Sequence, residues 1–246
     1  MSTAMKPVYK RIIIKLSGEA LACDDGSSIY DREKLEKVAK IVKAIHDMGV
    51  DIGIVVGAGN IWRGRTAERI GIEQAQADYM GMLGTIINGM ALQNSIEKVG
   101  LSCRLMSSIS IPQCCEPYLR RKAIHHLDSK RVIIFAGGTG NPYFTTDTTA
   151  TLRALEVGAD AILMAKNGVD GVYDSDPRKN PDAKLFDKLS YHEVVEKKLE
   201  VMDLTAVAML EGKPVKIRVF NMDDWDNFLK VVGGDDLGTT IDSEGK

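Results

Sequence analysis

Short apolar runs that end in glycine-rich turns and lead into helical segments recur along this chain. Residues 131–136 are typical of a buried parallel strand, and residues 137–147 (GGTGNPYFTTD) of a turn. Residues 147–157 then predict a helix with Gly158 as its C-cap. Free backbone N–H groups and the positive end of a helix dipole meet at such a corner, which favours an anion. The alternative is an ordinary strand–turn–helix connection that binds no ligand.

Strands and helices alternate in this way from end to end, which predicts an α/β fold with a mainly parallel central sheet in a three-layer αβα sandwich. No change in composition marks a linker, so residues 1–246 are expected to form a single domain. Strands are predicted at residues 10–16, 51–56, 102–106, 131–136, 160–164 and 215–220, with an edge strand near 239–241, and helices at 32–48, 73–99, 117–127, 147–157, 191–197, 203–211 and 223–231.

Three glycines weaken the predicted helix at residues 73–99 as an isolated helix. Gly81, Gly84 and Gly89 make sense if another backbone packs closely there, for example across a subunit interface.

The composition excludes several functional classes. A net charge of −2 provides no general basic surface for nucleic acid, and no apolar run is long enough to span a bilayer. Residues 1–11 lack the pattern of a signal peptide. The cysteines show no C-x-x-C spacing, so we expect reduced thiols and a cytoplasmic location. They are Cys23, Cys103, Cys114 and Cys115.

Four polar, glycine-rich segments follow predicted strands, at residues 15–18, 57–63, 137–147 and 166–176. In an open parallel sheet, ligands bind at the carboxyl ends of the strands. Each segment alone is a weak signal, but together they predict one site at one edge of the sheet.

A lysine and an arginine follow two of these strands. Lys15 ends an apolar strand ahead of Ser17 and Gly18, where its ammonium can contact a phosphate while the Gly18 backbone comes close. A lysine that extends to solvent at the sheet edge is the alternative. Arg63 follows residues 57–60 (GAGN) within one turn and can clamp a phosphate, although a surface arginine is the simpler explanation for that residue alone.

Acidic and aromatic residues complete the candidate set. Asp147 can complement the helix dipole or orient magnesium and phosphate through water, whereas Asp78 alone is best explained as a solvated helix carboxylate. Asn167, Tyr173 and Asp176 lie in the loop after the fifth strand. An aromatic ring followed by a carboxylate can grip adenine and ribose, but polar residues are expected in any such loop.

Motifs of other enzyme classes are absent from the sequence. It contains no G-x-x-x-x-G-K-[ST], G-x-S-x-G or H-E-x-x-H, and its four histidines form no ligand cluster. Trp62 occupies the place of the third glycine of a dinucleotide fingerprint, which disfavours that cofactor. The remaining interpretation is a phosphate-rich ligand that glycines, a lysine and an arginine hold.

Several longer segments carry a family resemblance in the same order along nearly the whole chain. They are KPVYKRIIIKLSGEAL (6–21), GAGNIWRG (57–64), ADYMGMLGTIINGMALQ (77–93), GTGNPYFTTDTTATLRA (138–154) and KNGVDGVYDSDP (166–177), with VMDLTA and IRVFNM near Val201 and Ile217. Together they resemble the bacterial-type uridylate kinases (UMP kinases) of the amino-acid-kinase superfamily.

The resemblance implies an enzyme that makes UDP from UMP with ATP and Mg²⁺ in de novo pyrimidine nucleotide biosynthesis. It implies catalytic roles for Lys15, Arg63 and Asp147, with Asp203 as an acidic position that supports the site. Mg²⁺ would be held through phosphates and water, with no direct protein ligand. The residues implied for ATP are Lys15, Leu16, Ser17, Gly18, Gly59, Arg63, Asn167, Tyr173 and Asp176, and those implied for UMP are Ala58, Asp78, Thr139, Gly140, Asn141, Pro142, Tyr143, Phe144, Thr145 and Thr146.

The family also implies a homohexamer and inhibition by UTP. Two departures from its pattern affect the expectations. Ala58 replaces a usual glycine and would be penalised if its φ were positive. Residues 23–28 (CDDGSS) differ from the family's GTP-activation region, which argues against activation by GTP. A non-catalytic nucleotide sensor and a kinase for another small acid or phosphate are the competing interpretations.

Overall fold

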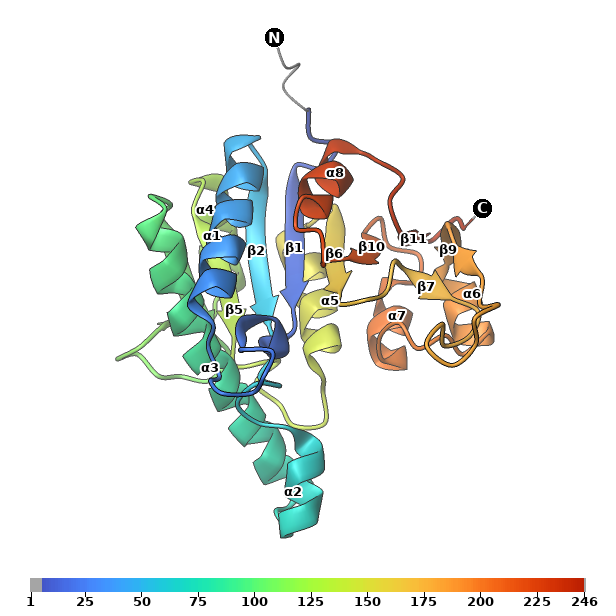
Figure 1. Cartoon of the computed structure of the whole chain (residues 1–246). Coiled ribbons are helices and arrows are strands. Elements are labelled where there is room, and N and C mark those ends of the chain that lie inside the picture. The colour runs from blue at the N-terminus through green and yellow to red at the C-terminus, as the bar shows by residue number, and fades with distance from the viewer. Residues whose placement is uncertain (1–5, 246) are drawn as a thin grey trace.

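A nine-stranded sheet runs through the molecule in the order β4-β3-β5-β2-β1-β6-β10-β11-β9 (Figure 1). The computed structural model describes residues 6–245. Every pairing in this sheet is parallel except that between β10 and β11. The strands are β1 (Arg11–Leu16), β2 (Asp51–Val56), β3 (Cys103–Ser107), β4 (Glu116–Pro117), β5 (Val132–Ala136), β6 (Ala161–Lys166), β9 (Lys188–Ser190), β10 (Lys216–Asn221) and β11 (Thr239–Asp242).

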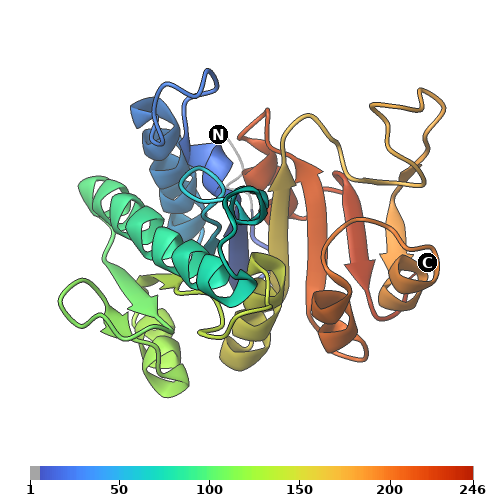
Figure 2. The same cartoon turned by 90° about the horizontal axis from the view of Figure 1, so that it is seen from below.

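Helices cover both faces of the sheet, which confirms the predicted α/β sandwich (Figures 1 and 2). On one face lie α1 (Arg32–Asp47), α3 (Gln74–Lys98) and α8 (Asn227–Gly233). On the other lie α4 (Arg120–Asp128), α5 (Thr146–Val157), α6 (Tyr191–Glu196) and α7 (Leu204–Leu210). The short helix α2 (Gly64–Ile70) contacts α3, and a 3-10 turn, η1 (Gly18–Leu21), follows β1.

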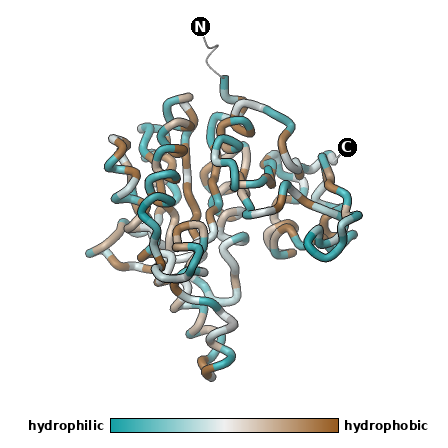
Figure 3. The backbone as a smooth tube through the Cα atoms, in the orientation of Figure 1, coloured by the Kyte–Doolittle hydropathy of each residue, from teal (hydrophilic) through white to brown (hydrophobic). Residues whose placement is uncertain are grey.

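The central strands are apolar on both sides because both sides are covered. In β1, Ile12 and Ile14 belong to the core beneath α1 and α3, whereas Ile13 belongs to the core beneath α5 and α7. All three side chains are buried. Figure 3 shows the same pattern, with hydrophobic colour concentrated on the central strands. An uninterrupted apolar run is therefore what a strand in the middle of this sheet requires.

The predicted helix ends are confirmed where capping chemistry is strong. The side chain of Asp31 accepts hydrogen bonds from the N–H groups of Glu33 and Lys34 at the start of α1. Thr145 caps α5 in the same way, and Gly158 ends that helix with φ of 68°.

Three predictions about local structure were wrong. The strand β11 is not at the edge, because the short strand β9 pairs with its outer side. The loop predicted after the fifth strand contains a short strand, β7 (Val172–Tyr173), which pairs with β8 (Leu185–Phe186) in a separate two-stranded sheet. The last helix begins at Asn227 rather than at residue 223, because the side chains of Asn221 and Asp224 accept N–H hydrogen bonds and form turns first.

No helix within residues 6–245 combines the length and the apolar character needed to cross a membrane.

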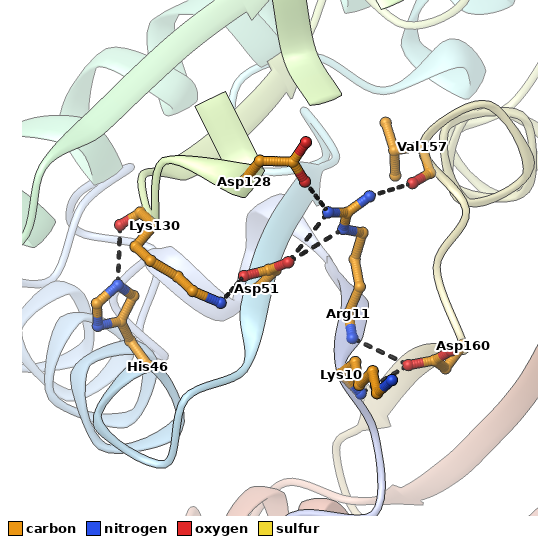
Figure 4. A network of polar contacts seen from close by, with 8 residues as sticks. All are labelled: Lys10, Arg11, His46, Asp51, Asp128, Lys130, Val157 and Asp160. Carbon is orange, nitrogen blue, oxygen red and sulfur yellow. Dashed lines mark hydrogen bonds and ion pairs between the residues drawn. The ribbon is translucent and has the colours of Figure 1, made fainter. Parts of the chain in front are cut away.

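An ion network joins the amino ends of the two central strands to the ends of α4 and α5 (Figure 4). The guanidinium of Arg11 lies 3.0 Å from the carboxylate of Asp51 and 2.6 Å from that of Asp128, and it donates to the carbonyl of Val157 at 2.6 Å. Lys130 reaches the other oxygen of Asp51 at 2.7 Å. Because the side chain of Asp51 is only 10% exposed, this network is shielded from solvent better than an ordinary surface pair.

Replacing Asp51 by Asn should lower the free energy of unfolding by about 2 kcal/mol, because it leaves the charges of Arg11 and Lys130 without their shared partner. Urea unfolding followed by circular dichroism measures the change. Asp47→Asn is the matched control, because Asp47 is exposed and contacts Lys43 and, at 4.0 Å, His46, so its loss should cost less than about 0.5 kcal/mol. Equal effects of the two substitutions would contradict this account.

Candidate active site

The carboxyl ends of β1, β2, β5 and β6 bring the four predicted segments together at one edge of the sheet, the end seen in Figure 2. The turns after β1 and β2 touch. A Cβ on Gly18 would lie 2.6 Å from the carbonyl oxygen of Gly57 and 2.9 Å from the nitrogen of Gly59. A Cβ on Gly57 would lie 3.6 Å from the hydroxyl of Thr146, at the start of α5. Glycine at position 18 therefore permits an approach that no side chain would allow.

Lys15 and Asp147 meet where these turns converge. The Nζ of Lys15 lies 2.8 Å from Oδ1 of Asp147, and the two side chains are 22% and 19% exposed. The contact is an ion pair without the alignment of a hydrogen bond, so the buried Oδ1 retains the capacity to accept from another donor. The pair joins the end of β1 to the first turn of α5.

Asp203 holds the start of α5 from the other side. It accepts hydrogen bonds from the hydroxyls of Thr145 and Thr148, the latter at 2.9 Å, and it caps α7 through the N–H of Ala206. Burial alone would raise the pKa of this carboxyl, but the hydrogen bonds outweigh burial and hold the pKa below its usual value. Asp203 therefore stays ionised and fixes two helix ends.

A cleft of about 740 Å³ opens beside Lys15. Five of the residues implied for ATP line it, namely Lys15, Ser17, Asn167, Tyr173 and Asp176. The side chain of Leu16 is buried in the core, so only its backbone can take part in binding. Gly18 and Gly59 lie in the neighbouring turns.

Lys166 also lines this cleft, but it was not predicted as a site residue. Burial, and secondarily the charge of Lys15, lower the pKa of its ammonium, which donates to the carbonyl of Val201 at 3.0 Å. The signal that would have found it is the one used for Lys15, since both lysines lie at the end of an apolar strand.

The turn after β5 is tied to α3 at two points. The N–H of Gly137 donates to the hydroxyl of Thr85 at 2.8 Å, and the N–H of Tyr143 donates to the carboxylate of Asp78 at 2.7 Å. Tyr143 has φ of 70°, which a tyrosine adopts only at a cost, so the contact with Asp78 stabilises an unfavourable backbone conformation. The alternative in which Asp78 is merely solvated is therefore wrong.

Alanine at position 58 causes no backbone strain, because Ala58 is not among the residues with positive φ. Its side chain packs against α3, where a Cβ added to Gly84 would lie only 2.9 Å away. A Cβ on Gly89 would likewise lie 2.5 Å from Leu105. The close neighbours of Gly84 and Gly89 are thus side chains of the same chain rather than the predicted backbone, and a Cβ on Gly81 would meet only the ring of Trp62 at 3.7 Å among the residues described.

The structure brings Arg63 to the rim of the site rather than to Lys15. Its guanidinium pairs with Glu19 at 2.5 Å and donates to the carbonyl of Gly59 at 3.2 Å. Glu19 lines the cleft, and both side chains of this pair are more than half exposed. Arg63 can therefore reach a ligand by a side-chain rotation that exchanges Glu19 for an anion.

The sequence matches the amino acid kinase family over residues 10–221, and the chain belongs to this family.

Proteins similar to this chain include uridylate kinases, both by sequence and by structure. The chain is 52% identical to the uridylate kinase of Pediococcus pentosaceus and 54% identical to that of Limosilactobacillus reuteri, in each case over 236 residues that cover 96% of this chain and 98% of the relative. The solved structure of UMP kinase from Bacillus anthracis superposes with a TM-score of 0.93 at 43% identity, covering 96% of this chain and 97% of that one. UMP kinase from Ureaplasma parvum gives 0.90 at 37% identity, with 95% and 98% covered.

Asp203→Asn should destabilise the protein by about 1–2 kcal/mol at pH 7, because a weaker acceptor then caps α7 and holds the hydroxyls of Thr145 and Thr148 at the start of α5. The folded pKa of Asp203 lies below its ordinary value of 3.8, so the unfolded state binds more protons. The carboxylate's stabilisation is complete above that ordinary value and disappears as pH falls through the folded pKa. The difference between parent and variant should therefore shrink from pH 5 to pH 3.

Urea unfolding at pH 7, 5, 4 and 3 measures this difference. Asp182→Asn, at an exposed position, is the control and should show no comparable difference at any pH. A gap between parent and Asp203→Asn that stays constant over this range would rule out the ionised carboxylate as its source.

Proposed function

We propose that this chain transfers the γ-phosphoryl group of ATP to UMP, producing UDP and ADP in pyrimidine nucleotide biosynthesis. The observation that carries the proposal is the ion pair of Lys15 and Asp147, between the cleft beside β6 and the turn that leads into α5. The names of the relatives and of the solved structures support the choice of substrate.

The cleft is proposed as the ATP site. Asn167, Tyr173 and Asp176 would hold the adenosine, and Lys15, Ser17 and Gly18 would hold the phosphates. The N–H groups of Ala58 and Gly59 have no hydrogen-bond partner within residues 6–245, so they can donate to phosphate oxygens. Lys166 adds a second half-buried lysine to the same cleft.

The acceptor site is proposed along the turn after β5. Residues 139–146 would wrap UMP, with Ala58 beside its phosphate and Asp78 on its ribose. The threonine cap of α5 and its helix dipole favour the negative charge of the phosphate.

The chemistry requires little from a general base. The second pKa of a phosphate is near 6, so the attacking oxygen of UMP is already ionised at neutral pH. The main barrier is repulsion between two anions, which Lys15 and Arg63 offset while the glycine turns orient the groups in line. Asp147 orients the ammonium of Lys15 through their ion pair.

Magnesium fits this site through nucleotide and water rather than through a protein cage. Residues 6–245 contain no group of three or more acidic, histidine or cysteine side chains placed to hold a metal. The buried Oδ1 of Asp147, which has no aligned donor, is suited to accept from a water bound to Mg²⁺. The ion would neutralise charge on the phosphates of ATP.

Lys15→Met should lower kcat by at least about 100-fold, because it removes a preorganised positive charge from the transferring group. A coupled assay for ADP, with Mg·ATP and with UMP, CMP, dUMP or AMP as acceptor, measures this and the substrate preference together. The parent should turn over mainly UMP.

Lys43→Met, which removes an exposed lysine paired with Asp47, is the control and should keep the parent's kcat. A folded Lys15→Met enzyme with a nearly normal rate would remove Lys15 from catalysis. A parent with no turnover of any acceptor but tight UTP binding would identify a sensor instead.

The proposal extends to assembly and regulation. We propose a single amino-acid-kinase-type domain that forms a homohexamer in the cytoplasm and is inhibited by UTP. Helix α3 supports the assembly, because it exposes an apolar stripe along one face. The stripe consists of Tyr79, Met80, Leu83, Ile87 and Met90, each at least 37% exposed.

Leu83→Glu should disperse the assembly, because it places a charge in the middle of an apolar contact. Light scattering coupled to gel filtration should report six 26.9 kDa chains for the parent and fewer for the variant. Val195→Glu, at an exposed apolar position on α6, is the control and should leave the mass unchanged. A monomeric parent would refute the proposed assembly.

A further inference from the structure

A fully buried asparagine lies on the inner side of α3, away from the apolar stripe. Asn88 is polar but has no solvent exposure. The nearby residues Ile86 and Leu92 of the same helix belong to the hydrophobic core. A buried amide with unsatisfied hydrogen bonds would cost several kcal/mol, so its partners need to be identified.

Each hydrogen-bonding position of the Asn88 amide is occupied. Its Nδ2 donates to the carbonyl of Gly57 at 2.7 Å and to Oδ1 of Asn60 at 2.8 Å. Its Oδ1 accepts from Nδ2 of Asn60 at 3.1 Å and from the hydroxyl of Tyr30 at 2.9 Å. The two amides thus pair reciprocally, and the two donors and two acceptor sites of Asn88 are all used.

The network extends to a third segment through Asn60. The remaining N–H of its amide donates to the carbonyl of Ile29 at 2.8 Å. Asn88 therefore connects α3 at once to the turn after β2 and to the segment that precedes α1.

The same contacts fix the spacing between two phosphate-binding turns. A Cβ on Gly18 would lie 2.4 Å from Oδ1 of Asn60 and 2.6 Å from the carbonyl of Gly57. Both atoms are hydrogen-bonded to Asn88. The turn after β2 therefore rests directly on the turn after β1, and Asn88 holds it there from behind.

We propose that Asn88 is a positioning residue for phosphoryl transfer, which acts through Gly57 and Asn60 to fix the N–H groups of Ala58 and Gly59 relative to Lys15. The proposal rests on the function proposed above. Because Asn88 is fully buried, this role requires no contact between Asn88 and either nucleotide. Its removal should disturb the alignment of the reacting groups more than it weakens substrate binding, because small misplacements affect the transition state most.

Asn88→Ala should lower kcat about 10- to 100-fold, while KM for UMP changes less than about threefold. Ile86→Val is the matched control, because it removes one buried methylene from the same helix without touching the amide network. It should lower stability slightly and leave kcat unchanged. A merely structural role for Asn88 predicts that both variants keep the parent's kcat once they are folded.

A second pair of variants keeps the proposal testable if Asn88→Ala folds poorly. Asn60→Ala removes the partner amide from a position that is not fully buried, and it should lower kcat in the same direction. Tyr30→Phe removes a hydrogen bond to Asn88 that involves neither turn, and it should change kcat less than about threefold. In the double variant of Asn60 and Asn88, the loss should be no greater than that of Asn88→Ala alone, because both act through one amide pair.

The parent's turnover of UMP, measured first with the same reagents, tests the proposed function separately. Suppose that the parent turns over UMP. If Asn88→Ala or Asn60→Ala then folds and has the same kcat as Ile86→Val, the positioning role is overturned, whereas the proposed function stands. Additive losses in the double variant would also overturn it. A parent without UMP turnover would instead refute the function on which the positioning role rests, and the positioning role with it.

Discussion

The ion pair of Lys15 and Asp147 is the contact on which the arrangement of the site depends. Two anions that must approach each other need a fixed positive charge between them, and a lysine side chain is too flexible to supply one unaided. Asp147 restrains the ammonium from the first turn of α5, and Asp203 restrains that turn through two threonine hydroxyls. The position of one charge is thus set by the packing of α5 and α7.

Much of the fold follows from the sequence because burial on both faces leaves a strong pattern. The run of isoleucines in β1, the cap at Asp31 and the glycine at 158 each have one simple structural explanation. Strands of two or three residues, such as β7 and β9, carry no such pattern, because tertiary contacts rather than their own side chains determine their pairing. The apolar spacing predicted that the last helix starts at residue 223, but two turns held by side-chain hydrogen bonds delay its start to Asn227.

The site was partly predictable for the same reason. Chain topology places Lys15 and residues 137–147 at one edge, so position along the sequence is enough to find them. The partners of Arg63 and Asp78 depend on loops whose course no periodicity describes. Asn88 had no sequence signal, because a polar residue on an apolar helix is usually assigned to the surface. Only the folded structure shows that Asn88 is fully buried and that Gly57, Asn60 and Tyr30 satisfy its amide.

Helix α3 explains why these features occur together. Its hydrophobic residues lie on nearly all sides, since one face packs on the sheet and the opposite face carries the exposed apolar stripe. The inner face contacts the site through Asp78, Gly84, Thr85 and Asn88. A helix of 25 residues with continuous hydrogen bonds moves largely as one body. A chain that docks on Leu83 and Ile87 would therefore restrain both turns proposed to bind nucleotide without touching either. The proposed assembly and the proposed alignment of the reacting groups would therefore depend on the same element.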